Sequence, residues 1–214
     1  MKKTDDEIYR ERKDFFNRRA ETWCDMWYRD ETTGRYDKHA RDFERLLSII
    51  DLKPGGRVLD VGCGTGVLVP FIREVITGKG ELYELDNADR MIEVNRQAHE
   101  ADNIHFVVAD AEDAPFDTAS FDAVICFSCF PHFHDREMAM MNLSRILKHR
   151  GIFVVSHFAS SDEINRLHRA HGHAVMHDRL PDEAAMRSLF LSAGLNIFLF
   201  TDEPGFYCVV ARKN

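Results

Sequence analysis

The sequence predicts an α/β fold with a mostly parallel β-sheet covered by helices on both faces, and three features of the chain indicate it. From Gly56 onward, short apolar runs alternate with longer segments of helical periodicity, which is typical of strands joined by crossover helices. Three alternating glycines, Gly62, Gly64 and Gly66, follow the first apolar run directly. Only residues 202–205 separate the last two apolar runs. This connection is too short for a crossover, so the last pair of strands is antiparallel.

The whole chain, 1–214, is expected to form one domain, because 214 residues suit a single α/β core and no Gly/Ser-rich linker divides them. Residues 1–52 are expected to form a helical lead-in, and residues 53–214 the core of sheet and helices. The lead-in carries many aromatic residues and is interrupted at Gly34. An amphipathic segment of this kind serves as core packing or as a lid over a pocket, and the two roles are compatible.

Seven strands are predicted, each an apolar run bounded by polar or turn-forming residues. They cover residues 57–61, 80–86, 104–109, 121–128, 152–158, 195–201 and 206–212. Helices are predicted where apolar residues recur at spacings of three and four. They cover residues 66–76, 88–101, 135–148, 161–171 and 182–193. This alternation places the carboxyl ends of the parallel strands at one edge of the sheet, where ligands bind in open α/β folds.

Residues that favour helix ends set several of the predicted boundaries. Asn87 is predicted as the N-cap of the second core helix. Gly78 and Gly194 are predicted to stop the helices that precede them. The basic run 148–150 suits the negative end of a helix dipole, and Gly151 then supplies the stop of the third core helix.

Charge and composition exclude several classes of partner. The formal net charge of −8 argues against nucleic acid or an anionic membrane as the main partner, since both select for lysine and arginine. No stretch approaches the ~20 apolar residues of a membrane span, and the charged start of the chain lacks the apolar core of a signal peptide. We therefore expect a cytoplasmic protein. The sequence sets no oligomeric state.

The five cysteines are odd in number and scattered, which argues against a disulfide framework. Cys126 and Cys129 form a Cys-x-x-Cys pair, a spacing that also occurs in redox pairs and metal sites. No second pair completes a four-thiolate site, so we interpret both as small apolar residues at the end of a strand.

The glycine turn carries the main functional signal. Residues 58–66 read Val-Leu-Asp-Val-Gly-Cys-Gly-Thr-Gly, and such a turn is expected to present backbone N–H groups and a helix N-terminus to a ligand. Asp60 adds a carboxylate, which suits a ligand with an amino group or another cationic centre. A dinucleotide fingerprint would need its third glycine where Val67 stands, and a phosphate loop would need a lysine that is absent.

This run resembles the first motif of class I S-adenosylmethionine-dependent methyltransferases. Between residues 55 and 158 the chain is similar to the small-molecule methyltransferases of ubiquinone and menaquinone biosynthesis, through Glu-Leu-Asp-Asn, Ala-Asp-Ala-Glu-Asp-Ala-Pro-Phe, Phe-Asp-Ala-Val-Ile and Leu-Lys-His-Arg-Gly-Ile-Phe. The resemblance implies a Rossmann-like, doubly wound sheet of seven strands that ends in an antiparallel hairpin, with S-adenosylmethionine as cofactor. The chain departs from the family at His149-Arg150-Gly151, where Pro-Gly-Gly is common, on the side of the sheet away from the expected cofactor site.

Acidic residues follow successive strands at the edge where a ligand is expected. Asp86 lies twenty residues past Gly66, where a carboxylate accepts both ribose hydroxyl protons. Nicotinamide enzymes carry an acid there too. By the resemblance, Asp110 and Ala111 would bind the adenine, Met91 would flank it, and Phe127 and Ser128 would pass the methionine part. The cofactor-binding residues are therefore predicted to be Asp60, Gly62, Cys63, Gly64, Gly66, Asp86, Asn87, Met91, Asp110, Ala111, Phe127 and Ser128.

Eight of the eleven histidines fall between residues 132 and 177, beside the expected acceptor side of the site. His132 follows the fourth predicted strand and His157 ends the fifth, so either is a candidate general base or substrate-orienting group. His157 and His168 are also candidate ligands of a divalent metal, which would bind and polarise the acceptor. Further candidates for such a site are His132, Glu163 and His171. A third interpretation makes most of these histidines surface or capping residues, above all His134, His173 and His177.

The sequence therefore predicts a methyltransferase that acts on a small molecule and uses S-adenosylmethionine. Oxygen, nitrogen, sulfur and carbon acceptors all stay open, and so does the presence of a divalent metal. Two alternatives are a cofactor-binding protein with other sulfonium chemistry and a nicotinamide oxidoreductase. Val67 and the closing hairpin argue against the oxidoreductase.

Overall fold

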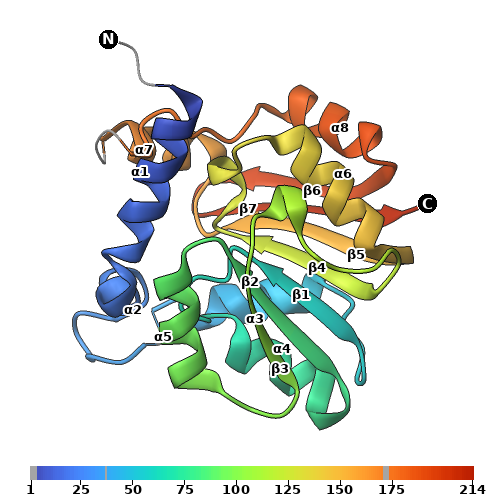
Figure 1. The fold of residues 1–214 in the computed structure, drawn as a ribbon, viewed down its shortest axis with the longest axis horizontal. Coiled ribbons are helices and arrows are strands. Elements are labelled where there is room, and N and C mark those ends of the chain that lie inside the picture. The colour runs from blue at the N-terminus through green and yellow to red at the C-terminus, as the bar shows by residue number, and fades with distance from the viewer. Residues whose placement is uncertain (1–3, 37, 171–173) are drawn as a thin grey trace.

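A computed structural model describes residues 4–36, 38–170 and 174–214, and its centre is a sheet of seven strands (Figure 1). The strand order is β3-β2-β1-β4-β5-β7-β6. The first five strands in the chain pair in parallel, whereas β7 is antiparallel to both β5 and β6. This arrangement confirms the predicted fold class and hairpin. The strands are β1 (Arg57–Val61), β2 (Glu81–Asp86), β3 (Ile104–Val108), β4 (Phe121–Phe127), β5 (Leu147–His157), β6 (Leu195–Glu203) and β7 (Phe206–Lys213).

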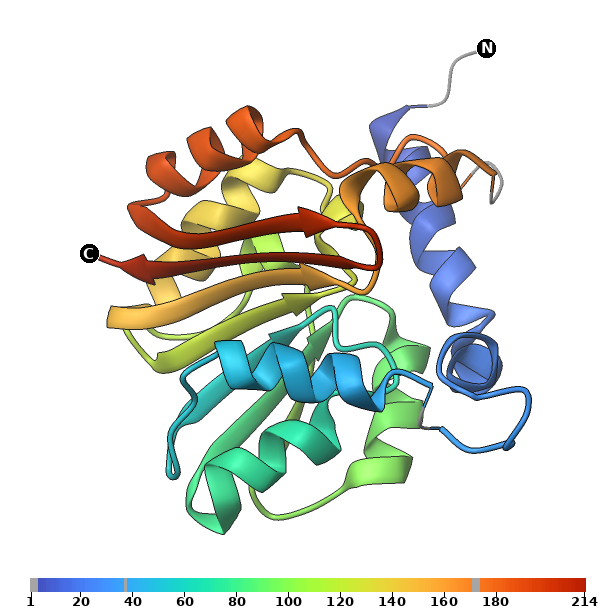
Figure 2. The ribbon, with the colours of Figure 1, turned by 180° about the vertical axis from the view of Figure 1, so that it is seen from behind.

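Helices cover both faces of the sheet and bury two apolar clusters (Figures 1 and 2). On one face lie α3 (Ala40–Ile49) and α4 (Val69–Ile76). On the other lie α6 (Arg136–Ile146) and α8 (Glu183–Ser192), while α5 (Asp89–His99) packs on β2 and β3. Short 3-10 turns connect several elements: η1 (Ala20–Thr22), η2 (Thr77–Lys79), η3 (Ala111–Asp113) and η4 (Phe130–His132).

Three helices gather at the carboxyl ends of the parallel strands, on the left of Figure 1. They are α1 (Asp5–Asn17) and α2 (Trp23–Trp27) from the lead-in, and α7 (Ser161–Ala170) from the segment after β5. A capping box starts α1, because Thr4 and Glu7 accept each other's backbone N–H. His171, the last residue of the predicted helix, lies outside the described residues.

The predicted end of the helix over 135–148 is wrong. α6 ends at Ile146, and Leu147 already pairs with Phe121 of β4. The register then shifts, so that residues 148–151 form a bulge in which Arg150 has a φ of 63°. Strand pairing therefore overrides the helix dipole, and the basic residues lie in β5 rather than at a helix end.

Two further helix boundaries differ from the prediction. The helix predicted over 66–76 begins at Val69 and ends at Ile76 as predicted, but the residue that stops it is the C-cap Thr77, with a φ of 61°, rather than Gly78. Asn87 is not an N-cap: Ala88 takes that position without a side-chain bond, and its N–H donates to Asp86 Oδ1 at 2.8 Å. Gly194 does end α8 in a left-handed conformation, with a φ of 73°, as predicted.

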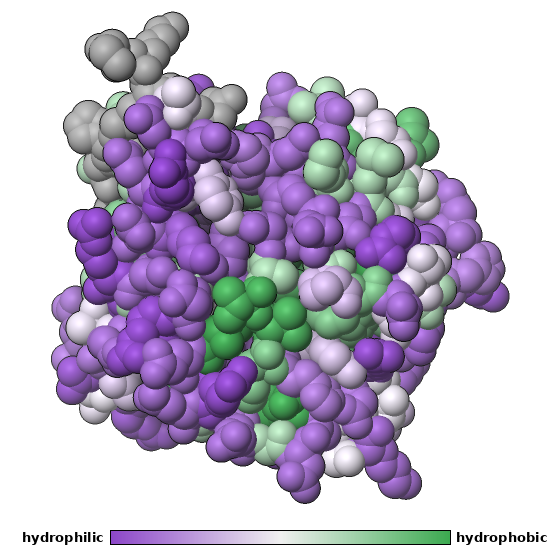
Figure 3. Space-filling model, viewed as in Figure 1, coloured by the Kyte–Doolittle hydropathy of each residue, from purple (hydrophilic) through white to green (hydrophobic). Residues whose placement is uncertain are grey.

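The face drawn in Figure 3 is mostly hydrophilic, with an apolar patch near its centre over the edge strand β3. Val108 at the end of that strand is 50% exposed. Among the described residues, no helix combines the length and apolar character required to cross a membrane.

Candidate cofactor and acceptor site

A cavity, here named the glycine-turn cavity, lies at the carboxyl edge of the parallel strands. Every residue predicted to bind the cofactor lines it except Gly66, and His132 lines it as well. His157 and His168 lie outside its lining. The lead-in supplies a further part of the wall, through Tyr9, Arg12, Phe16, Trp23 and Tyr28. The sequence therefore predicts the strand-end part of the wall, and the lead-in part comes from the tertiary structure.

The three glycines of the turn have different neighbours. A Cβ on Gly62 would lie 2.3 Å from Cβ of Cys129, and a Cβ on Gly66 would lie 2.1 Å from Oδ1 of Asn95. Both glycines are therefore needed for packing of the protein itself. A Cβ on Gly64 would meet only Nε1 of Trp23, at 3.8 Å. Gly64 is thus the glycine with open space on its cavity side.

Four backbone N–H groups of the turn are already paired, which corrects the expectation that the turn presents them to a ligand. Gly62 and Cys63 donate to the carbonyl of Leu85, and Gly66 donates to the carbonyl of Cys63. Gly64 donates to Oδ2 of Asp86 at 2.9 Å. A ligand at this turn would therefore contact the Cα surface of Gly64 and the nearby carboxylates rather than these four N–H groups.

Two acidic side chains are buried side by side beneath the turn. Asp60 of β1 is in register with Glu84 of β2, and burial followed by the charge of Glu84 raises the pKa of Asp60 well above its usual range. Burial raises the pKa of Glu84 to about 8, although Asn95 donates to it at 2.7 Å. Oδ1 of Asp60 has no hydrogen-bond partner in the described part of the chain. A cationic ligand in the cavity would stabilise the ionised form of both groups.

The strand-end acids Asp86 and Asp110 also have partners within the protein. Asp86 accepts from the N–H groups of Gly64 and Ala88, while burial raises its pKa to about 6. The phenol of Tyr9 donates to Asp110, with its oxygen 2.6 and 2.8 Å from the two carboxylate oxygens. Asn87 Nδ2 donates to the same carboxylate at 3.0 Å. Tyr9 therefore occupies the carboxylate predicted to bind the adenine.

The lead-in narrows the glycine-turn cavity. This cavity encloses about 100 Å³, which is less than the roughly 300–1,000 Å³ of pockets that hold small molecules. Phe16 and Trp23 pack against an apolar cluster of Ala20, Ala88 and Met91, so the lead-in is core packing and roof at once. A ligand of cofactor size would need lead-in side chains such as Tyr9 to move.

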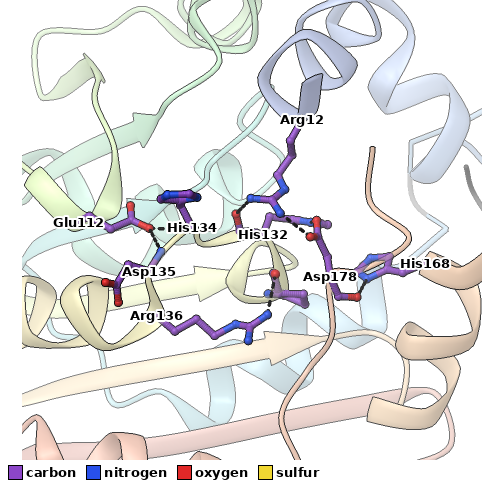
Figure 4. Close-up of polar contacts among 9 residues, drawn as sticks. Arg12, Glu112, His132, His134, Asp135, Arg136, His168 and Asp178 are labelled. Carbon is purple, nitrogen blue, oxygen red and sulfur yellow. Dashed lines mark hydrogen bonds and ion pairs between the residues drawn. The ribbon is translucent and has the colours of Figure 1, made fainter. Parts of the chain in front are cut away.

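A charged network joins the lead-in to the rim of the cavity (Figure 4). Nδ1 of His132 lies 2.7 Å from Oδ2 of Asp178, and Arg12 pairs with Oδ1 of the same carboxylate. Arg12 also donates to the carbonyl of His132 at 2.9 Å. Burial would raise the pKa of Asp178, but the hydrogen bond from His132 and the two positive partners outweigh it and lower that pKa.

The other candidate histidines are held in different ways. His157 is 2% exposed, and burial followed by the charges of His132 and His168 lowers its pKa to about 3. Nδ1 of His168 lies 2.8 Å from the carbonyl of Asp178. Glu163 accepts from the N–H groups of Ser160 and Gly205, at the start of α7.

Within residues 4–36, 38–170 and 174–214, no group of three His, Cys, Asp or Glu side chains is arranged to hold a metal ion.

The Cys-x-x-Cys pair lies in the core, as interpreted from the sequence. Cys126 and Cys129 are buried and unpaired by disulfide. Sγ of Cys129 donates to the carbonyl of Val61 at 2.9 Å, and the same side chain packs on Gly62. The pair therefore supports the glycine turn.

Comparison with known proteins identifies this architecture. A family model described as "Methyltransferase domain" matches residues 59–155, the part of the chain that contains the glycine turn and all the strand-end acids. This part of the chain is similar to the methyltransferase domain of class I S-adenosylmethionine-dependent methyltransferases. S-adenosylmethionine is the cofactor of this family.

The methyltransferase domain has curated relatives and similar solved structures. It is 32% identical over 111 residues to a ubiquinone/menaquinone biosynthesis C-methyltransferase of Vibrio cholerae, covering 50% of this chain and 43% of that protein. A demethylmenaquinone methyltransferase of Staphylococcus epidermidis is 31% identical over 120 residues, covering 56% of this chain and 50% of the relative. The matches thus span about half the length of these relatives. A SAM-dependent methyltransferase of Aquifex aeolicus has the same fold, with a TM-score of 0.67, 20% identity, and coverage of 81% and 90% of the two chains.

The acidic residues of the methyltransferase domain fit a cofactor with positive charge. Among the residues that the structure describes, the buried Oδ1 of Asp60 has no hydrogen-bond partner, and Glu84 is buried beside it. Added positive charge would therefore stabilise both carboxylates. Glu84 is absent from the predicted set, although strand alternation places it on the same side as Asp86. Tyr9, Arg12 and Asp178 are also absent from that set. They reach the site only through tertiary packing, and no local pattern marks them.

Proposed function

We propose that this protein transfers a methyl group from S-adenosylmethionine to a small-molecule acceptor. The observation that carries the proposal is the glycine-turn cavity of the methyltransferase domain, whose wall holds all the predicted cofactor residues except Gly66. S-adenosylmethionine, when bound there, supplies a methyl group already activated by its sulfonium. The roof formed by α1 and α2 favours a small acceptor over a polymer. A cytoplasmic location stays a prediction.

Three groups of residues would hold the cofactor. Asp60, whose buried Oδ1 has no hydrogen-bond partner in the described part of the chain, suits the amino group or the positive charge. Asp86 suits the ribose hydroxyls, since each carboxylate oxygen has capacity beyond its one backbone donor. Asp110 suits the adenine amine once Tyr9 leaves it, beside the buried side chains of Met91 and Ala111.

His132 is the residue best placed to take a proton from the acceptor. Its Nδ1 faces the carboxylate of Asp178, which selects the tautomer with the proton on Nδ1 and leaves the lone pair on Nε2. His132 lines the glycine-turn cavity, so the base would stand beside the transferred methyl. His157 is less suited, because it lies outside this cavity and burial disfavours its protonated form.

Calorimetry with S-adenosylmethionine and its demethylated product tests the proposal. We expect micromolar binding of both, loss of binding in Gly64→Arg, and weaker binding in Asp86→Ala. The purified protein with radiolabelled cofactor and a metabolite extract should then transfer label to a small molecule. Absence of binding by either ligand would overturn the proposal, whereas binding without label transfer would favour the sulfonium-chemistry alternative.

A further inference from the structure

A second cavity lies beside the first, between the lead-in and α7, and is here named the aromatic cavity. It encloses about 380 Å³, within the roughly 300–1,000 Å³ range of small-molecule pockets. Leu167 of α7 and Val175 form part of its far wall. Met26 and Leu167 are 46% and 36% exposed, so the aromatic cavity opens to solvent at their side.

Three residues line both cavities and form the partition between them: Phe16, Trp23 and His132. The ring of His132 lies edge-on to Phe16, with centroids 5.1 Å apart. The ring of Trp23 faces Gly64, the open glycine of the turn. A molecule in the aromatic cavity would therefore contact the proposed base, His132, and would reach the methyl group once the lead-in side chains of the partition move, as a ligand of cofactor size already requires.

The lining of the aromatic cavity selects for flat rings. Phe15, Phe16, Trp23 and Trp27 all contribute to it. Their rings meet edge-on or tilted, with centroid distances of 5.4 Å for Phe15–Phe16, 5.6 Å for Phe16–Trp23 and 5.9 Å for Trp23–Trp27. Aromatic side chains in such arrangements bind another ring by stacking or edge contacts.

The charge of this lining is positive. Arg19 lies over the ring of Phe15, with its guanidinium carbon 3.6 Å from the ring centroid, and donates to the Phe15 carbonyl. His132 and His168 also line the cavity, and among the described lining residues there is no aspartate or glutamate. An anionic group on the ligand would therefore form a charge-assisted hydrogen bond with the guanidinium of Arg19.

We propose that the aromatic cavity is the acceptor site, and that the acceptor is a planar aromatic acid of one or two rings with an ionisable hydroxyl group. This inference rests on the proposed function. The hydroxyl would meet Nε2 of His132 at the partition, and the carboxylate would meet Arg19. The acceptor oxygen forms a bond to the methyl carbon as the carbon–sulfur bond breaks. The electron pair of that bond stays on sulfur as a neutral thioether, and the hydroxyl proton goes to Nε2 of His132.

The chain offers a direct optical test, because its two tryptophans, Trp23 and Trp27, both line this cavity. The protein is first saturated with the demethylated cofactor product, and 4-hydroxybenzoate and 4-hydroxycinnamate are then titrated while tryptophan fluorescence is recorded. We expect saturable quenching, with a Kd about tenfold lower than for p-cresol, which lacks the anion, or cyclohexanecarboxylate, which lacks the ring. Absent quenching, or equal affinity for all four compounds, would overturn the inference.

Matched variants separate this site from the cofactor site. Leu167→Phe fills the aromatic cavity from its rim, and its control, Leu191→Phe, lies on α8 at a position that is 72% exposed. We expect Leu167→Phe to abolish the quenching, Arg19→Gln to weaken binding of the acids but not of p-cresol, and Leu191→Phe to change neither. All three should bind the demethylated product as the unmodified chain does.

The two proposals fail in different ways. If the demethylated product does not bind, the proposed function fails. If the demethylated product binds normally while Leu167→Phe binds the aromatic acids as tightly as the unmodified chain does, only the proposed acceptor site is wrong.

Discussion

Nδ1 of His132 lies 2.7 Å from Oδ2 of Asp178, a residue 46 positions further along the chain. Arg12 of the lead-in closes the arrangement by pairing with the other carboxylate oxygen. One buried acid thus orients the proposed base and fixes the lead-in above the glycine-turn cavity. Asp178 acts through His132, so it is a positioning residue.

The Asp178→Asn variant should lower kcat about 100-fold, the scale of a lost general base, with little change in KM for the cofactor. The neutral amide of asparagine holds the His132 proton on Nδ1 less firmly than the carboxylate does. Steady-state kinetics, with the acceptor found by label transfer, measures kcat and KM. The variant also leaves the Arg12 charge unmatched and should unfold more readily by about 3 kcal/mol. A stability loss with an unchanged kcat would make Asp178 purely structural.

The Tyr9→Phe variant should bind the demethylated cofactor product about fivefold more tightly. In the closed site the Tyr9 phenol occupies both oxygens of Asp110, and a net hydrogen bond is worth about 1 kcal/mol. Calorimetry measures the change. Tyr36→Phe is the control, because that phenol bonds Asp25 on the exposed surface. Weaker binding in Tyr9→Phe would mean that Tyr9 holds the ligand instead of competing with it.

Gly62 and Gly64 should respond differently to substitution. In Gly62→Ala the new Cβ meets Cβ of Cys129 at 2.3 Å, so we expect a loss of about 3 kcal/mol in the free energy of unfolding. In Gly64→Arg the side chain enters open space beside Trp23, so cofactor binding should be lost while the fold persists. Thermal unfolding and calorimetry on both variants distinguish the two effects. A Gly64→Arg protein that binds normally would place the ligand elsewhere.

Glu84 should make stability depend on pH. Its pKa is raised from 4.5 to about 8, so the folded protein keeps a proton that the unfolded chain releases. Stability should therefore fall as the pH rises through this window and level off above it. Glu84→Gln should be more stable than the unmodified chain by an amount that grows across the window, to the order of 3 kcal/mol.

Urea unfolding at about pH 5 and about pH 8 measures this growth. Glu74→Gln, an exposed position on α4, is the matched control and should show no such growth. An equal effect of Glu84→Gln at both pH values would mean that Glu84 is ionised in the fold.

The alternation of apolar runs and helical patterns determined the fold class, since its two periods correspond to strands and amphipathic helices. The short 202–205 connection determined the antiparallel hairpin. The spacing of glycines and strand-end acids determined the edge at which the cavity forms. These features are local, so the sequence alone carries them.

Tertiary structure decided what local patterns do not encode. Leu147 pairs with Phe121 and draws residues 148–151 into a bulged strand, although their composition suits a helix end. Three of the turn amides, those of Gly62, Cys63 and Gly64, find acceptors in Leu85 and Asp86, because β2 lies beside β1.

The site depends on the same long-range packing. Tyr9 meets Asp110 across 101 positions of the chain, and Arg12 meets Asp178 across 166. Such pairs form only when the lead-in folds over the strand ends, because burial of its aromatic face brings distant polar groups together. The sequence thus determined the sheet and the edge where a ligand binds, and the packing of the lead-in decided which side chains close that edge.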